Sequence, residues 1–220
     1  MKVVVRIDKS EQKRFAQFLI QEIAEQIERK LRSKTVEIRQ KIQHAIREEW
    51  EKDPTVLSLK EKTFGSLKGD LGLTDAISNN LDQILEAVLK SMNLDFPAVK
   101  LFGNKARVVY HWQFLPVNYF DLLGLDIAEY ISVSEYKGTS TRIPWLEWLL
   151  MGTSGVQGYF VQTWEDGDPG KSRSNFAIMW RNKGRTWRMP SQHAGHANSN
   201  FLTKIIQRSS HFVLDILDEL

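Results

Sequence analysis

The hydrophobic pattern near the start of the chain predicts one very long amphipathic helix. Asp8 lies three residues before Glu11, a capping-box spacing typical of a helix start, and no Gly or Pro follows before Trp50. Asp53-Pro54 is expected to end the helix. Apolar residues recur in steps of mostly four, which places them on one helix face: Phe15, Leu19, Ile23, Ile27, Leu31, Ile38, Ile42, Ile46 and Trp50.

The length of this helix bears on how the protein assembles. A helix of about 43 residues spans roughly 65 Å at 1.5 Å per residue. A compact domain of 220 residues has a diameter of roughly 45 Å. Either the helix bends, or another chain covers part of its apolar stripe.

After Pro54 the pattern predicts helices mixed with antiparallel strands. We expect a second helix from Thr74, a short helix that begins near Pro144, and a final helix capped by Asn200. The expected strands cover 99–102 and 106–114, which form a hairpin around Gly103-Asn104, and 128–133, 159–164 and 176–180. The predicted fold class is α+β, with a very long N-terminal helix and further helices packed on a small antiparallel sheet. Residues 1–53 form an N-terminal strand (3–7) and the long helix, and residues 54–220 form the α+β body, as one integrated domain.

The composition excludes several classes of protein. Hydrophobic residues make up 42% and charged residues 26% of the chain, which are ordinary globular values. The absence of cysteine excludes disulfides, zinc–thiolate sites and a cysteine nucleophile. No apolar run approaches the roughly 18 residues of a membrane helix, and the first residues do not resemble a secretory signal. We expect a protein assembled inside a cell, with no membrane partner.

The positive charge is concentrated in the second half of the chain. The net charge is only +3, but no acidic residue lies between Asp168 and Asp215. This segment attracts phosphate or an acidic protein surface, unless acids such as Asp121, Asp126 and Glu129 fold beside it. Its cations are Lys171, Arg173, Arg181, Lys183, Arg185, Arg188, Lys204 and Arg208.

Four of these cations are candidates for an interface or for the lining of a DNA channel. Lys183-Gly184 predicts a turn between the strand that ends at Trp180 and Trp187. Arg181, Lys183, Arg185 and Arg188 would then project from one loop tip. Such a cluster requires counter-charge nearby, either from DNA or from acidic residues of a neighbouring protein.

Tryptophan is abundant, with seven in the chain. Trp145 and Trp148 are three residues apart on a predicted helix, so both rings should enter the same core. Trp residues are also enriched at interface hot spots. Trp145, Trp148 and Trp187 are therefore candidate core or interface anchors.

No residue pattern indicates an enzyme. The chain lacks a Gly-x-Gly-x-x-Gly motif, a phosphate-binding loop and a Gly-x-Ser-x-Gly elbow. The nearest metal motif is His193 and His196, but Gly195 favours a loop, and no nearby carboxylate completes a site. A hydrolase with this histidine pair as metal ligands stays open as an alternative. We expect no catalytic residues, no metal and no cofactor.

Several segments occur in an order that resembles head–tail joining (neck, or tail-completion) proteins of tailed bacteriophages. In that group a long helix precedes an "LRGELGI" segment, and an "IPWLEWLL" helix is followed by a Ser-Arg-Ser/Thr-Gly segment, a Trp-x-Val-Pro-Pro turn and a final "NNFITRAI" helix. Asn175, Ser191 and Gln192 depart from the group's pattern. The corresponding segments here are 65–73, 143–150, 172–179, 187–190, 194–195 and 200–205.

The resemblance implies a non-enzymatic virion protein of the phage neck, assembled in the bacterial host cytoplasm. Such proteins form rings around the channel through which DNA passes from head to tail. The implied partners are further copies of the chain and other connector proteins, namely a portal-side adaptor or head-closure protein and the tail terminator. The resemblance also allows non-specific contact with DNA in the channel. The alternative is a nucleic-acid-binding protein that uses the basic segment 171–208.

Overall fold

The structure is a computed structural model of the chain. The strand predicted at 3–7 and the polar loop at 165–174 lie outside the residues that it describes. Those residues are 8–95, 100–102, 105–107, 111–113, 119–134, 139–152, 155–163 and 177–218.

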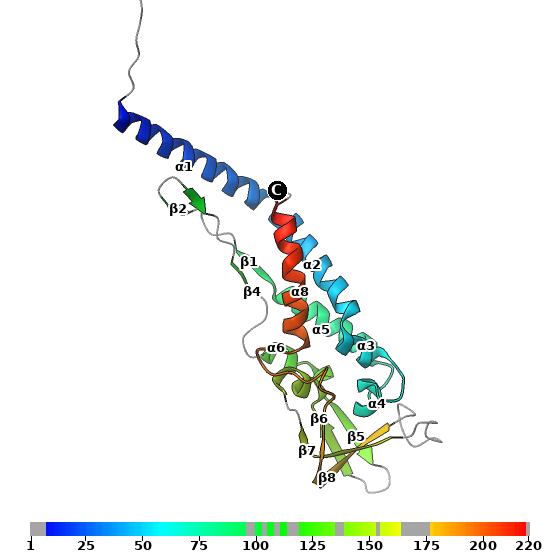
Figure 1. Cartoon of the computed structure of the whole chain (residues 1–220). Helices are drawn as coiled ribbons and strands as arrows, with labels where there is room; N and C mark the ends of the chain where they lie inside the picture. The colour runs from blue at the N-terminus through cyan, green and yellow to red at the C-terminus, as the bar shows by residue number, and fades with distance from the viewer. Residues whose placement is uncertain are drawn as a thin grey trace, which may run out of the picture.

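Helices dominate the described part of the chain, and short strand pairs accompany them (Figure 1). The helices are α1 (Lys9–Ser33), α2 (Thr35–Lys52), α3 (Pro54–Lys60), α4 (Leu67–Leu71), α5 (Ile77–Ser91), α6 (Phe120–Leu123), α7 (Trp145–Glu147) and α8 (Phe201–Asp218), with a 3-10 turn η1 (Asp126–Ala128) and a π-helical segment η2 (Trp148–Gly152). The antiparallel strand pairs are β1 (Asn93–Asp95) with β4 (His111–Gln113), β2 (Lys100–Phe102) with β3 (Lys105–Arg107), β5 (Tyr130–Ser134) with β6 (Thr139–Ile143), and β7 (Val156–Thr163) with β8 (Ala177–Trp187). The predicted α+β class is confirmed.

The predicted N-terminal helix is interrupted once, at Lys34. The Ser33 hydroxyl donates to the carbonyl oxygen of Lys30 at 2.8 Å. The Thr35 hydroxyl donates to the carbonyl oxygen of Arg32 at 2.9 Å. Ser and Thr side chains that bind helix carbonyls in this way bend helices, and α1 meets α2 at an angle (Figure 1). The long helix is confirmed, but its unbroken course to Trp50 is not.

Both ends of this helical region are set by aspartates. Asp8 is the N-cap of α1, as predicted. Its carboxylate accepts a hydrogen bond from the Ser10 hydroxyl, so the expected capping box does not form. α2 ends before Asp53, whose carboxylate caps α3 by accepting from the Thr55 amide at 2.9 Å. Pro54 occupies the first turn of α3, where its missing N–H costs nothing.

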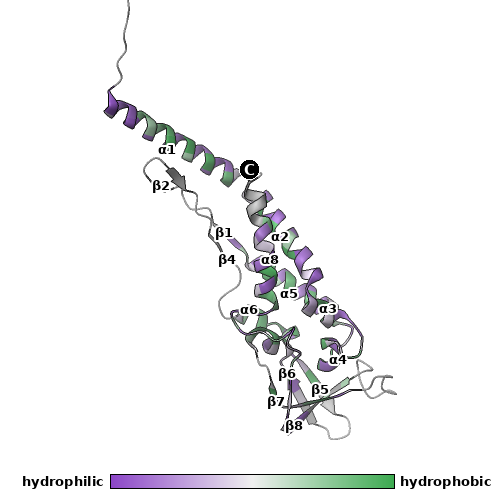
Figure 2. Cartoon of the chain, viewed as in Figure 1, coloured by the Kyte–Doolittle hydropathy of each residue, from purple (hydrophilic) through white to green (hydrophobic). Residues whose placement is uncertain are grey.

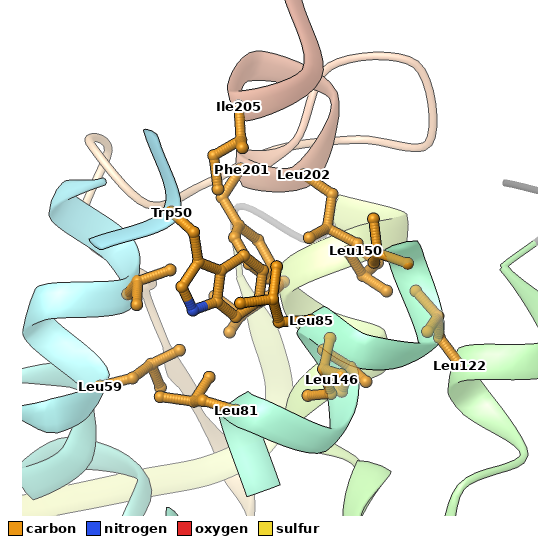
Figure 3. Packing of buried hydrophobic residues seen from close by; sticks show 14 of the residues in the cluster. Trp50, Leu59, Leu81, Leu85, Leu122, Leu146, Leu150, Phe201, Leu202 and Ile205 are labelled. Carbon is orange, nitrogen blue, oxygen red and sulfur yellow. The ribbon is translucent and has the colours of Figure 1, made fainter. Parts of the chain in front are cut away.

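One apolar core connects α2, α5, α8 and the α7–η2 segment. Trp50 lies at its centre, and its ring centroid is 5.9 Å from that of Phe201 at the start of α8. Figure 3 shows leucines from α3, α5, α6 and α7–η2 converging on this pair. The buried face of α2 (Ile38, Ile42, Ile46 and Trp50) is therefore part of the body's core.

The central strands differ from the sequence prediction. Residues 99–114 were expected to form one hairpin. The pairing of β2 with β3 confirms the hairpin predicted around Gly103-Asn104. β4, which was predicted to continue the second strand of that hairpin, pairs with β1, which follows α5. β6 was not predicted, because Thr139–Ile143 is largely polar and lacks an apolar alternation; it pairs with β5. The apolar segment after Pro144 is helical as predicted, but it becomes a π-helix from Trp148.

The segment before α8 folds tightly against η2. A Cβ atom at Gly152 would lie 1.8 Å from the carbonyl oxygen of Gly195, so only glycine fits here. The Asn200 side chain accepts from the Thr203 amide at 3.1 Å and donates to the Leu150 carbonyl oxygen at 3.1 Å. Asn200 thus caps α8, as predicted, and also fixes the helix to η2.

Candidate functional site

The four candidate cations lie on or directly after β8, at the end of the molecule opposite α1 (Figure 1). Their side chains are all exposed. β8 continues alongside β7 as far as Trp187, which pairs with Val156. The prediction that the chain turns back at Lys183-Gly184 is therefore wrong.

A large irregular bulge in β8 replaces the expected turn. Arg181 pairs with Tyr159 and Thr186 pairs with Gln157, so Gly158 alone faces the four residues 182–185. Gly158 has φ of +81°, which favours glycine. Inside the bulge, the Asn182 side chain accepts a hydrogen bond from the Gly184 amide at 3.1 Å. Lys183 and Arg185 lie inside the bulge, and Arg181 lies at its edge, where it pairs with Tyr159.

Arg185 also packs on the strand pair itself. Its guanidinium carbon lies 4.6 Å from the centroid of the Phe160 ring, a cation–π contact. No carboxylate of the described residues forms an ion pair with Arg181, Lys183, Arg185 or Arg188. Arg188 is set apart, where it lines a shallow depression together with Gly155, Gln157 and Thr186. The structure therefore gathers three of the four cations at the bulge and places the fourth next to it.

The rest of the basic segment does not join this surface. Arg208 of α8 binds two carboxylates of the α2–α3 junction, Glu49 at 2.9 Å and Asp53 at 2.6 Å. Among the acids expected to balance the segment, Glu129 instead pairs with Arg142. Lys171 and Arg173 lie outside the described residues.

The three candidate tryptophans are buried in the core. The Trp145 indole N–H donates to the Ile127 carbonyl oxygen at 2.9 Å. Trp148 contacts Tyr159 of β7 edge to face, with ring centroids 5.0 Å apart, and its centroid is 6.2 Å from that of Trp187. Trp148 thus contacts Tyr159 on one face of the β7–β8 pair, and Arg181 lies directly opposite Tyr159. Arg185 packs on Phe160, the next residue along β7.

Asp70 is a residue under this sheet that the sequence did not point to. Burial raises the pKa of the Asp70 carboxyl to about 6, and a hydrogen bond from the Trp187 side chain partly opposes this shift. α4, which carries Asp70, packs against β8. In the sequence, Asp70 stood out only as part of the Gly65–Leu73 segment, which resembles the phage group. Its partner Trp187 is distant in sequence, so no local pattern indicated their contact.

His193 and His196 lie in different surroundings. His193 is buried, its Nδ1 lies 3.1 Å from the Thr55 hydroxyl, and burial lowers its pKa. His196 is exposed and forms a bridge with Ser199. In the described part of the chain no three His, Cys, Asp or Glu residues gather as metal ligands would.

A second candidate surface is the apolar face of α1. Its large side chains are 38–63% exposed, whereas the corresponding positions on α2 are buried. Figure 2 shows the hydrophobic residues recurring along α1, which extends away from the body. An exposed apolar stripe of this length marks an interaction surface. Its residues are Phe15, Phe18, Leu19, Ile23 and Ile27.

Comparison of the chain with protein-family models, curated proteins and solved structures finds no match. Across the described residues, no helix combines the length and the hydrophobicity needed to cross a membrane.

Proposed function

We propose that the chain is a non-enzymatic structural component of a phage neck, a ring-forming head–tail connector around the DNA channel. The observation that carries the proposal is the apolar stripe of α1. Its large side chains face solvent although the same spacing on α2 is fully covered. An apolar face of α1 that is exposed in the single chain is suited to contact other chains.

Two further observations support this role. The ordered segments between Gly65 and Ile205 resemble phage neck proteins. The β8 bulge and its edge carry the exposed Arg181, Lys183 and Arg185, which have no ion-pair partner among the described residues, so this region suits an acidic surface on an adjacent chain or the DNA in the channel. Virion location and the connector partners follow from the resemblance and belong to the proposal.

The nucleic-acid-binding alternative rests on the same bulge. Arg208 does not contribute to it, because its guanidinium is held by Glu49 and Asp53. A protein that binds duplex DNA through three phosphate contacts would lose affinity with salt at a slope near −3 on logarithmic axes. Binding measured by fluorescence anisotropy, with and without Arg181→Ser, Lys183→Ser and Arg185→Ser, distinguishes the two functions.

Electron microscopy tests the neck proposal directly. We expect assembled particles to contain the chain as closed rings with a central channel, and labelled particles to carry it between head and tail. Label along the tail or inside the head would overturn the neck assignment. Monomers that bind duplex DNA with the steep salt dependence above would favour the alternative.

A further inference from the structure

One side of the α1 stripe is closed by the chain itself, and the other side is open. Ala24 and Leu31 lie on one flank and are buried, and α1 contacts β3. Phe15, Leu19, Ile23 and Ile27 follow each other at intervals of four on the exposed face. Any further chain must therefore approach from the open flank.

The area of this face is large enough for a stable contact between two copies. A fully exposed Phe presents roughly 200 Å², and Leu or Ile somewhat less. The five exposed side chains therefore present on the order of 450 Å² of apolar surface per copy. Two copies that cover each other would bury about 900 Å² of apolar area. With the polar flanks this reaches the roughly 1,000 Å² that a specific interface requires.

In one orientation, the charged residues on the open flank of one copy face residues of opposite charge on a second copy. Glu11 and Arg29 are 18 residues apart, which is five full helical turns, so they project in the same direction. Arg14 and Glu25 share that side, 11 residues or close to three turns apart. In an antiparallel pair centred on Ile20, Glu11 is level with Arg29 of the second copy, and Arg14 lies within one residue, about 1.5 Å along the axis, of its Glu25. The two-fold axis repeats each contact, which gives four ion pairs.

A parallel pair would neither bring the two open flanks together nor match their opposite charges. Parallel helices place the open flank of one helix against the opposite flank of the other, and here that flank carries the buried Ala24 and Leu31. Antiparallel helices place the open flanks against each other. Glu11 and Arg14 form no ion pair within the described part of the chain, so neither charge is already paired there.

We propose that the occupant of the α1 stripe in the free protein is a second copy of this chain, bound through α1 in an antiparallel, two-fold arrangement. A two-fold contact closes after two copies and cannot repeat around a polar ring. The dimer would therefore keep the stripe covered before assembly, and ring formation would replace this contact. The dimer itself goes beyond the proposed function and does not depend on it.

Charge exchange tests the arrangement. Sedimentation equilibrium of the full chain should give a dimer. Glu11→Arg breaks two of the ion pairs and creates two repulsions, so dimerisation should weaken about tenfold, since exposed pairs each contribute about 0.2–1 kcal/mol. Arg29→Glu should act alike, and the double variant should recover to within about threefold. Glu37→Lys on α2, which removes the exposed Glu37–Lys41 pair, is the matched control and should change nothing.

The double variant separates dimer contacts from helix stability. Glu11→Arg places a cation near the N-terminus of α1 and Arg29→Glu an anion near its C-terminus, and both oppose the helix dipole. If helix stability alone controlled dimerisation, the double variant would be the weakest of the three. Recovery in the double variant therefore supports the antiparallel contact. A monomeric wild-type chain at about 100 μM, well above the Kd of a specific interface, or a double variant no better than the singles, overturns it.

Cysteine cross-linking gives the orientation, since the chain contains no cysteine. Glu11→Cys and Arg29→Cys chains are mixed and oxidised. The antiparallel pair predicts the mixed disulfide, because the two Glu11 positions are about 27 Å apart at 1.5 Å per residue. Disulfides between identical variants, with no mixed product, contradict the proposal.

Discussion

α1 and α2 have the same apolar periodicity but opposite surroundings. On α2 the stripe is covered by α5, α8 and the rest of the core, and Ile42 is fully buried. On α1 the equivalent stripe projects from the body, and Ile23 is 54% exposed. The bend at Lys34 divides the two halves. Periodicity therefore predicts that a helix has an apolar face, but the tertiary fold decides whether this chain or another one covers it.

The largest expected difference comes from deletion. A chain that begins at Lys34 lacks α1 but keeps every buried residue of α2, so it should fold. A chain that begins at Asp53 also loses Ile38, Ile42, Ile46 and Trp50 from the core and should not fold. Near-ultraviolet circular dichroism of the tryptophans and the presence of a cooperative thermal transition distinguish the two chains. Loss of the transition in both would show that α1 belongs to the folding core.

A matched pair of substitutions sharpens the comparison. Ile42→Ala should lower the free energy of unfolding by about 2–5 kcal/mol, because it leaves a cavity in a packed core. Ile23→Ala should lower it by less than about 0.5 kcal/mol, because the side chain faces solvent in the single chain. Urea denaturation at protein concentrations that favour the monomer gives both values. Equal losses would contradict the difference in burial.

Local signals in the sequence predicted much of the fold, and long-range pairing limited the rest. The start of α1, the cap at Asn200 and the interruption at Asp53-Pro54 depend on neighbouring residues and were predicted correctly. The pairing of β4 with β1 and the continuation of β8 beyond Lys183 depend on distant partners. A Lys-Gly pair is compatible with either a turn or a bulge, and only β7 decides between them. That the four cations form an interface stays a prediction, whereas the turn expected at Lys183-Gly184 was wrong.

Asp70 provides a pH-dependent test within the body. Its folded-state pKa of about 6 lies above the usual value of 3.8, so the native state binds more protons than the unfolded state between these values. Stability should fall as the pH rises from about 4 to about 6 and then stay level. Asp70→Asn removes this loss and should raise the thermal midpoint above pH 6, with little change below pH 4.

Asp8 at the start of α1 is the matched control for this test. Its side chain is exposed, and hydrogen bonds with Ser10 lower its pKa. Asp8→Asn keeps a capping residue and should leave the thermal midpoint nearly unchanged at both pH values. An Asp70→Asn profile parallel to that of the wild type would show that Asp70 does not carry the pH dependence. The buried His193 has the opposite effect on stability, because its lowered pKa removes stability as the pH falls below 6.5. This effect is the same in the wild type and in the Asp70→Asn variant, so it cancels when their thermal midpoints are subtracted.

The smallest effect concerns the bend itself. Ser33→Ala with Thr35→Ala removes the hydroxyls that occupy the carbonyl oxygens of Lys30 and Arg32. We expect α1 and α2 to straighten while stability changes by about 1 kcal/mol or less. Spin labels on two introduced cysteines, one on each helix, should report a longer separation in the double variant. An unchanged separation would assign the bend to packing of α1 on β3.

The central claim is that α1 is an assembly surface and α2 is core, and sedimentation velocity of the Leu19→Asp/Ile23→Asp variant tests it most directly. Both positions are exposed, so the charges should not unfold the body, but they would be desolvated in any contact between chains. We predict that the wild-type chain associates in a concentration-dependent manner, and that the variant is a monomer with the same thermal midpoint. A variant that associates like the wild type, or one that unfolds, would contradict the account.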